Sequence, residues 1–182
     1  MKITFKIMTV LLGFIVLPSC TTQDIEKLAA VESLLQKGEF TFVAERANPT
    51  NPEIVKVMAS IPGNNSSKML NLDSGYTIEI RKDELEVTLP YFGKLYAENI
   101  EPDKKIYQIT AEDFATKDFT INKKDGKKGS TVFNIVANNQ QNIRKMNMEV
   151  FKNGKAHVWV DSNDKQSISY DGYITTNLIT KK

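Results

Sequence analysis

The sequence Met146-Asn147-Met148-Glu149-Val150-Phe151-Lys152-Asn153-Gly154-Lys155-Ala156-His157-Val158-Trp159-Val160 contains two segments of alternating apolar residues around an Asn-Gly pair. This pattern is typical of a β-hairpin. A two-residue loop would pair Val150 with His157 and leave Val158 beside Glu149. A three-residue loop with Gly154 in the left-handed conformation gives apolar pairs throughout, namely Val150 with Ala156, Met148 with Val158, and Met146 with Val160. We expect the second loop, a positive φ at Gly154, and His157 and Trp159 on the opposite face, beside Glu149 and Asn147.

A second hairpin is predicted earlier in the chain. Residues Tyr76, Ile78 and Ile80 alternate with polar residues, and after Lys82-Asp83 the alternation resumes at Leu85, Val87 and Leu89. A two-residue loop sets Ile80 opposite Leu85 and Ile78 opposite Val87, so both apolar sets share one face. Further strands are expected at Phe40–Ala44, Lys105–Thr110, Asp118–Lys123, Ser130–Asn138, Ile143–Phe151, Lys155–Ser162 and Gln166–Ile174. We predict a mainly β (β-rich α+β) domain that is either a single antiparallel, strongly curved sheet or a barrel-like domain.

Two helices complete the expected fold. The first spans Gln23–Lys37, with an apolar stripe that should pack on the domain and that consists of Ile25, Leu28, Val31 and Leu35. Gly38 should end this helix. The second is a short inserted helix over Pro52–Ser60, because Asn51 is a good cap and proline is favoured in a first helical turn.

The N-terminus reads as an export signal. Lys2 and Lys6 precede the apolar run Ile7–Leu17, which is shorter than the roughly 20 residues that cross a bilayer. Leu17-Pro18-Ser19-Cys20 resembles a bacterial lipobox, and this resemblance implies removal of residues 1–19 and lipidation of Cys20. The alternative is an ordinary secreted protein with an incidental cysteine. We expect residues 20–38 to form the anchor and N-terminal helix, and residues 39–182 the β-rich domain.

The charge of the chain argues against nucleic-acid binding. There are 24 Lys and Arg against 22 Asp and Glu, and two of the lysines lie in the predicted signal, so the remaining side-chain charges balance. The protein therefore has no overall positive electrostatic potential that would attract a polyanion. With a lipid on Cys20, we expect an exported protein that is anchored in a membrane, most readily the outer membrane. Both the periplasmic face and the cell surface are compatible with the sequence.

Signatures of catalysis are missing from the sequence. It contains no Gly-x-Ser-x-Gly elbow, no phosphate-binding glycine loop and no His-Glu-x-x-His, and lipidated Cys20 would not be a nucleophile. His157 is the single histidine. We therefore expect no catalytic residues, no metal site and no cofactor.

Three segments resemble one family. They are Phe40-Thr41-Phe42-Val43-Ala44-Glu45-Arg46-Ala47-Asn48-Pro49, Leu89-Pro90-Tyr91-Phe92-Gly93-Lys94-Leu95-Tyr96 and Gln166-Ser167-Ile168-Ser169-Tyr170-Asp171-Gly172. With the lipobox, they are similar to the DUF4251 (domain of unknown function) family of Bacteroidetes lipoproteins. The resemblance implies a cell-envelope location and a β-rich fold, and it brings no activity and no catalytic residues.

The aromatic residues Tyr91, Phe92 and Tyr96 form a candidate binding rim together with Trp159. Pro90 should end regular strand pairing and Gly93 should permit a sharp turn, which predicts a loop here. Loops at the end of a rigid sheet often carry function. The alternative is that Tyr91 and Phe92 fold inward and close the end of the core, with Tyr96 the most exposed of the three.

Three classes of function fit these observations. We favour a non-catalytic cell-envelope lipoprotein that binds a small molecule, a glycan or another envelope protein. The second class is a structural or assembly lipoprotein without a small ligand. The third is an enzyme without a recognisable motif, built on Asp, Glu, Tyr or Lys. A pocket lined by aromatics would favour the first, an apolar outer patch the second, and convergent carboxylates the third.

Overall fold

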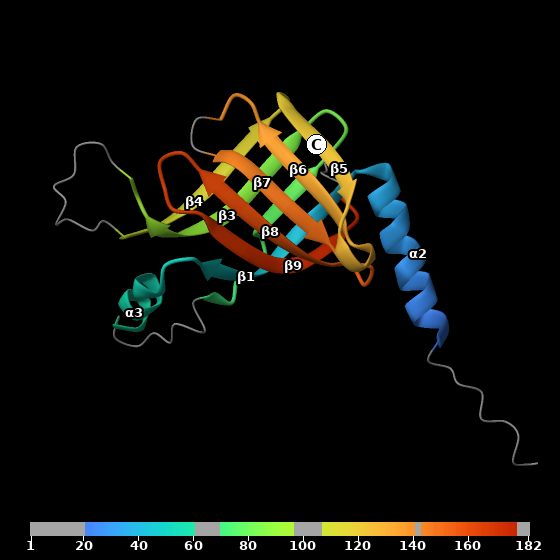
Figure 1. Cartoon of the computed structure of the whole chain (residues 1–182), viewed down its shortest axis with the longest axis horizontal. Helices are drawn as coiled ribbons and strands as arrows, with labels where there is room; N and C mark the ends of the chain where they lie inside the picture. Colours follow the sequence, from blue (N-terminus) through green and yellow to red (C-terminus); the bar gives the residue numbers. More distant parts are fainter. Residues whose placement is uncertain (1–20, 61–69, 97–106, 141–142, 178–182) are drawn as a thin grey trace, which may run out of the picture.

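In the part of the chain that the structure describes, the fold is a single antiparallel sheet of nine strands that curls into a half-barrel (Figure 1). The computed structural model describes residues 21–60, 70–96, 107–140 and 143–177. In sheet order the strands are β4 (Tyr107–Thr116), β3 (Leu85–Lys94), β2 (Thr77–Ile80), β1 (Phe40–Pro49), β9 (Ile168–Thr175), β8 (Lys155–Ser162), β7 (Ile143–Val150), β6 (Thr131–Ala137) and β5 (Phe119–Asp125). The predicted β-rich fold with a strongly curved sheet is confirmed.

Both predicted hairpins form in the expected register. In the β7–β8 hairpin Val150 pairs with Ala156, Met148 with Val158 and Met146 with Val160. Gly154 has a φ of 82°, so the three-residue loop with a left-handed glycine is confirmed. In the β2–β3 hairpin Ile80 pairs with Leu85 and Ile78 with Val87. Each turn therefore places apolar residues of two strands on one face.

The core fills the inside of the curled sheet. Buried residues alternate with more exposed ones along β6 and β8, and Phe40 of β1 meets Phe133 of β6 edge to face with ring centroids 5.2 Å apart. The largest fully buried side chains are Tyr91, Tyr170, Phe40, Phe42, Phe133, Met58, Ile78, Ile80, Leu85, Leu89, Ile135 and Ile143. Because these contacts come from most of the strands, they hold the sheet in its curled shape.

Helix α2 (Thr21–Lys37) packs on the sheet only through its C-terminal half. Val31 is buried against Gly154 of the β7–β8 hairpin. The Lys123 ammonium donates a 2.8 Å hydrogen bond to the Leu35 carbonyl, where a cation complements the helix C-terminus. Ile25 and Leu28 are 64% and 44% exposed. The expectation that the whole stripe packs on the domain is wrong for the first turns, which extend away from the sheet in Figure 1.

Helix α3 (Pro52–Ser60) follows β1 and lies beside the end of that strand (Figure 1). Its bounds match the prediction. The Asn51 side chain accepts a 2.9 Å hydrogen bond from the Glu53 amide, which is the predicted cap. Ile54 and Met58, one turn apart, are buried and attach the helix to the core.

Strand β3 continues through Pro90, which corrects the prediction of a loop there. Pro90 pairs with Ala111 of β4, and pairing continues to Lys94. The Pro90 carbonyl accepts a 2.7 Å hydrogen bond from Tyr170 of β9. Since the amide and carbonyl of one strand residue point to the same side, the ring nitrogen of Pro90 faces away from β4. The missing N–H therefore costs β3 no hydrogen bond to β4.

Candidate functional site

The face of the sheet turned away from the core carries two rows of polar residues that cross β1, β9, β8 and β7. The charged row contains Arg46, Asp171, His157 and Glu149 in consecutive registered pairs. The tryptophan row contains Asn48, Ser169, Trp159 and Asn147, paired in the same way. The two rows are neighbours because their members lie two residues apart on each strand. We call this surface the outer face.

Asp171 is the centre of the hydrogen bonds on the outer face. Its Oδ2 accepts a 2.7 Å hydrogen bond from Asn48 Nδ2, and its Oδ1 lies 2.7 Å from His157 Nδ1. Arg46 Nε in turn donates to Asn48 Oδ1 over 3.2 Å. Partial burial opposes ionisation of Asp171, but the hydrogen bonds of His157 and Asn48 and the nearby charges outweigh it, so its pKa lies below the ordinary value. Asp171 is an anion at neutral pH.

Trp159 is held in place on the outer face by a hydrogen bond from its indole. The ring N–H donates to Asp161 Oδ1 over 2.7 Å. Ser167 Oγ donates to the same oxygen, also over 2.7 Å. The side chain of Trp159 remains 37% exposed. A fixed, half-exposed indole of this kind offers contact area that loses little conformational freedom on binding.

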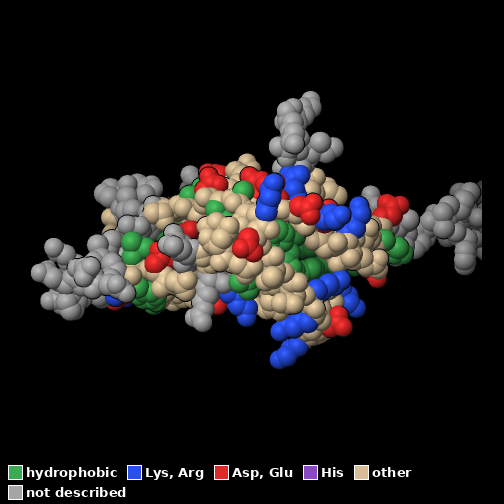
Figure 2. All heavy atoms as spheres, turned by 90° about the horizontal axis from the view of Figure 1, so that it is seen from above, with side chains coloured by type: hydrophobic (Ala, Val, Ile, Leu, Met, Phe, Trp, Pro, Cys, Tyr) green, Lys and Arg blue, Asp and Glu red, His purple; other side chains and the backbone are tan. Residues whose placement is uncertain are grey.

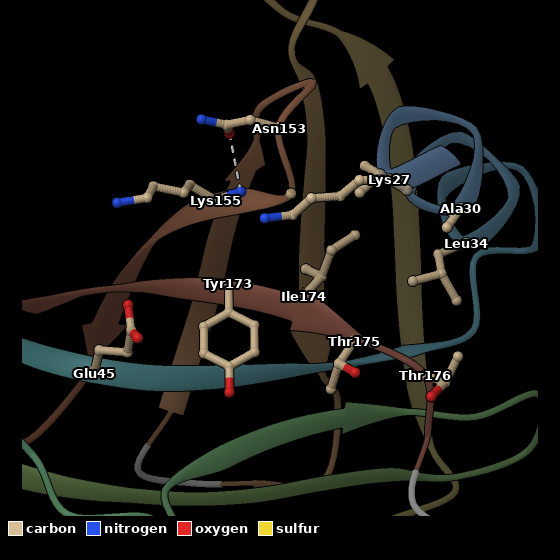
Figure 3. Close-up of a pocket in the computed structure, with 12 residues that line it drawn as sticks. Lys27, Ala30, Leu34, Glu45, Asn153, Lys155, Tyr173, Ile174, Thr175 and Thr176 are labelled. Atoms are coloured by element: carbon tan, nitrogen blue, oxygen red, sulfur yellow. Dashed lines mark hydrogen bonds between the residues drawn. The ribbon is translucent and has the colours of Figure 1, made fainter. Parts of the chain in front are cut away.

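A groove of about 560 Å³ lies beside the outer face, between α2 and β9. Figure 3 shows Tyr173, Glu45 and Lys155 on the strand side of the groove and Lys27, Ala30 and Leu34 on the helix side. Tyr173 is 40% exposed and pairs with Lys155 across β9 and β8. Because Tyr173 lies two residues from Asp171 on the same strand, it shares the outer face with the charged row.

The predicted aromatic rim separates into core and surface residues. Tyr91 and Phe92 are buried in β3, so neither can form a rim and the inward alternative holds for both. Tyr96 is 56% exposed, as expected, and its amide donates to the Asp164 carbonyl over 2.7 Å. Trp159 lies on the outer face instead. The four residues therefore do not form one site.

Two buried tyrosines connect β3 with the chain around β9. Tyr170 donates to the Pro90 carbonyl, and the Tyr91 hydroxyl lies 3.0 Å from the Gln166 carbonyl and 3.1 Å from the Lys94 carbonyl. Tyr170 thus bonds the residue next to Tyr91, and Tyr91 bonds the segment that leads to Tyr170. We call this pair the tyrosine clasp. Burial raises the pKa of both hydroxyls, so both remain donors well above neutral pH.

A buried ion pair lies next to the tyrosine clasp. Lys165 Nζ bonds Glu112 Oε1, and the same ammonium lies 4.9 Å from the centre of the Tyr91 ring. Burial lowers the pKa of the Lys165 amine. Glu112 points inward from β4, an edge strand, and an inward charge is one means by which proteins discourage edge-to-edge association. Its position indicates a structural role.

Sequence reasoning found only part of the outer face. It placed His157 and Trp159 beside Glu149 and Asn147, and this placement is confirmed. It missed Asp171 and Tyr173. Alternation along the predicted strand Gln166–Ile174 would have put Asp171 and Tyr173 on one face. The pairing of that strand with β1 and β8 was not predicted, so the second half of the surface could not be assembled.

In the described part of the chain, no three or more His, Cys, Asp or Glu side chains come close enough together to hold a metal ion. None of the helices in this part is long and apolar enough to cross a membrane. Acidic and basic side chains are interspersed on the surface that Figure 2 draws. Cys20 lies outside the described residues.

A curled antiparallel sheet with a helix at its N-terminal end makes this chain a β-rich half-barrel domain. The family model for a domain of unknown function, DUF4251, matches residues 22–174. The chain therefore belongs to the DUF4251 family, as the sequence resemblance predicted. The solved structure of a DUF4251 family protein from Bacteroides eggerthii DSM 20697 is similar in fold, with a TM-score of 0.50 and 9% identity over 85% of this chain and 90% of that one. No curated protein matches the chain.

Proposed function

We propose that this protein is a cell-envelope lipoprotein, anchored in the outer membrane through a lipid on Cys20, whose β-rich domain binds a ligand or partner without catalysis. The anchor is supported by the sequence Leu17-Pro18-Ser19-Cys20 after a short apolar run. The observation that carries the binding role is the indole of Trp159, fixed by Asp161 at the side of a hydrogen-bonded charged row.

The chemistry of the outer face suits binding better than catalysis. A general acid or base works best when its pKa lies near the operating pH. The pKa of Asp171 is lowered, so its carboxylate accepts hydrogen bonds and does not exchange protons near neutrality. Both of its oxygens already have partners in Asn48 and His157. This arrangement presents a rigid polar surface.

Helix α2 suits the role of a spacer in an anchored protein. It begins at Thr21, directly after Cys20, and contains 17 residues. A helix of this length spans about 25 Å. Its first turns extend away from the sheet (Figure 1). A lipid on Cys20 would thus leave the domain separated from the membrane surface and its outer face accessible.

Two measurements test the proposal. The intact mass of the membrane-extracted protein should equal that of a chain beginning at a triacylated Cys20, and an unmodified thiol would contradict the anchor. Hydroxyl-radical footprinting, read by mass spectrometry, should show protection of Trp159 by one soluble polysaccharide or protein fraction of the envelope. Phe151, exposed at the β7–β8 hairpin, is the matched control and should be oxidised equally. Binding through the outer face is refuted if no fraction protects Trp159.

A structural or assembly role is the second candidate, and the exposed side chains of α2 favour it. Ile25 and Leu28 lie three residues apart on the helix and are largely exposed. A protein partner that packs on this stripe would bury both. Substitution of both by Ser should then abolish assembly and leave the protection of Trp159 unchanged.

A further inference from the structure

We propose that the outer face binds a neutral, linear oligosaccharide, with Trp159 and Tyr173 as two separate stacking positions. This inference rests on the proposed function, because it names the class of ligand for the same surface. The two rings are carried by neighbouring strands and are 37% and 40% exposed. Each can cover the C–H face of a sugar ring while the edges of that ring remain available for hydrogen bonds.

The strand register places both rings on the same side of the sheet. Tyr173 pairs with Lys155, and Trp159 pairs with Ser169. Residues 155, 157 and 159 alternate with buried Ala156, Val158 and Val160, so the odd-numbered side chains all point outward. Four residues separate the two positions along β8, which corresponds to about 13 Å. This separation exceeds the width of one sugar ring and requires a ligand with several.

The polar groups between the two rings suit sugar hydroxyls. The pair formed by His157 and Asp171 lies in the register position midway between them, and Asn48 joins Asp171 from β1. Carboxylate oxygens, an amide and an imidazole offer both donors and acceptors, as a hydroxyl requires. Their mutual hydrogen bonds fix their orientation before a ligand arrives, which reduces the entropy lost on binding.

The distribution of charge favours a neutral glycan over an anionic ligand. Along the charged row, Arg46 is followed by the carboxylate of Asp171, and Glu149 ends the row beyond His157. Arg46 also donates to Asn48 and Asn71, so its guanidinium is engaged within the protein. Lys155 is exposed on the same face beside Tyr173, so Arg46 and Lys155 balance these two carboxylates, and no net positive field attracts a polyanion. An apolar protein surface would bury the same carboxylates without replacing their contacts with water.

Fluorescence of the purified, detergent-extracted mature protein tests the inference directly. Trp159 is the single tryptophan of the chain, so its emission reports on one stacking position. The probes are cellohexaose, maltohexaose, chitohexaose and mannohexaose, each with its disaccharide and monosaccharide. At least one hexasaccharide should change the emission in a saturable way, with an affinity about tenfold above that of its disaccharide because it reaches both rings.

Substitutions of the aromatic residues locate the site by calorimetry. Trp159→Ala and Tyr173→Ala should each weaken hexasaccharide binding by about tenfold, whereas Trp159→Phe should retain most of it. Tyr96→Ala, at an exposed tyrosine off the outer face, should bind like the wild type. Binding that survives both alanine variants, or that is lost in Tyr96→Ala, overturns the placement of the site.

Failure of this inference can be separated from failure of the proposed function. If no sugar of the panel changes the emission at millimolar concentration, the glycan assignment is wrong. Protection of Trp159 by an envelope protein fraction in the footprinting experiment would then leave the binding role intact. Absence of both effects overturns both.

Discussion

Removing one hydroxyl from the tyrosine clasp should destabilise the whole domain. Tyr170 is 1% exposed and donates a 2.7 Å hydrogen bond to the Pro90 carbonyl. In Tyr170→Phe the ring remains, and the buried carbonyl loses its donor. An unsatisfied buried polar group costs about 1 to 3 kcal/mol. For a domain of this size, 2 kcal/mol lowers the melting temperature by about 4 to 8 °C.

Tyr91→Phe should have a smaller effect than Tyr170→Phe. The hydroxyl of Tyr91 lies between two carbonyls, at 3.0 Å from Gln166 and 3.1 Å from Lys94, and its single proton is shared between them. Loss of an ordinary hydrogen bond of this kind costs about 1 kcal/mol. Differential scanning calorimetry of both variants, beside wild type, measures the order.

Tyr173→Phe is the matched control for the clasp, because the Tyr173 residue is 40% exposed and lies on the outer face. We expect its melting temperature to stay within about 2 °C of wild type. A second readout is alkaline pH. Burial raises the pKa of Tyr170 in the folded state, so wild type should lose stability as the pH rises above about 10, and Tyr170→Phe should lose less. If Tyr170→Phe melts like Tyr173→Phe, the clasp does not stabilise the fold.

Three further substitutions test other contacts. A Cβ at Gly172 would lie 1.9 Å from the Val43 carbonyl oxygen, so Gly172→Ala should separate β1 from β9 and cost about 3 kcal/mol or more in urea unfolding; an unchanged midpoint would contradict this close approach. Glu112→Ala leaves Lys165 buried without its partner and should cost about 3 kcal/mol, most of which Glu112→Leu combined with Lys165→Met should restore. Because the pKa of Asp171 is lower in the folded than in the unfolded state, its carboxylate stabilises the fold above about pH 3.9, and this contribution is lost as the pH falls through the folded-state pKa. Asp171→Asn should therefore flatten the acid limb of the curve of stability against pH. An identical limb would show that the carboxylate contributes nothing.

The hairpins could be predicted from the sequence because their pairing is local. Around Gly154, only one loop length puts all the apolar residues on one side, and the same holds for Ile80 and Leu85. The cap at Asn51 is equally local. Contacts of this kind need no knowledge of the remaining chain.

The sheet order could not be predicted, because it depends on pairings between distant segments. Strand β1 lies between β2 and β9, and the pairing of β1 with β9 joins segments more than 100 residues apart. Pro90 illustrates the consequence. Proline in a strand is disfavoured because it lacks a donor, and that argument predicted a loop. It failed because the hydrogen-bonding side of Pro90 faces Tyr170 and not a strand partner.

The apolar stripe of α2 was misleading for a related reason. The helical period correctly indicated a helix and the face that contains Val31. Periodicity cannot tell how much of that face the domain covers. The sheet reaches only the C-terminal half, where Gly154 and β9 meet the helix, so Ile25 and Leu28 remain exposed.

The segment Gln166–Gly172, one of those that carry the family resemblance, serves the core and the surface at once. Along β9, Tyr170 and Gly172 point inward to the clasp and to β1, while Asp171 and Tyr173 point outward. Alternation separates the two roles by single residues. Sequence similarity in this segment therefore does not by itself indicate a shared ligand, since the inward residues maintain the half-barrel whatever is bound. Under the proposed binding role, differences in ligand between members of the family would follow from the outward residues. A relative that keeps the equivalents of Tyr170 and Gly172 but lacks those of Trp159 and Tyr173 should fold alike and bind something else.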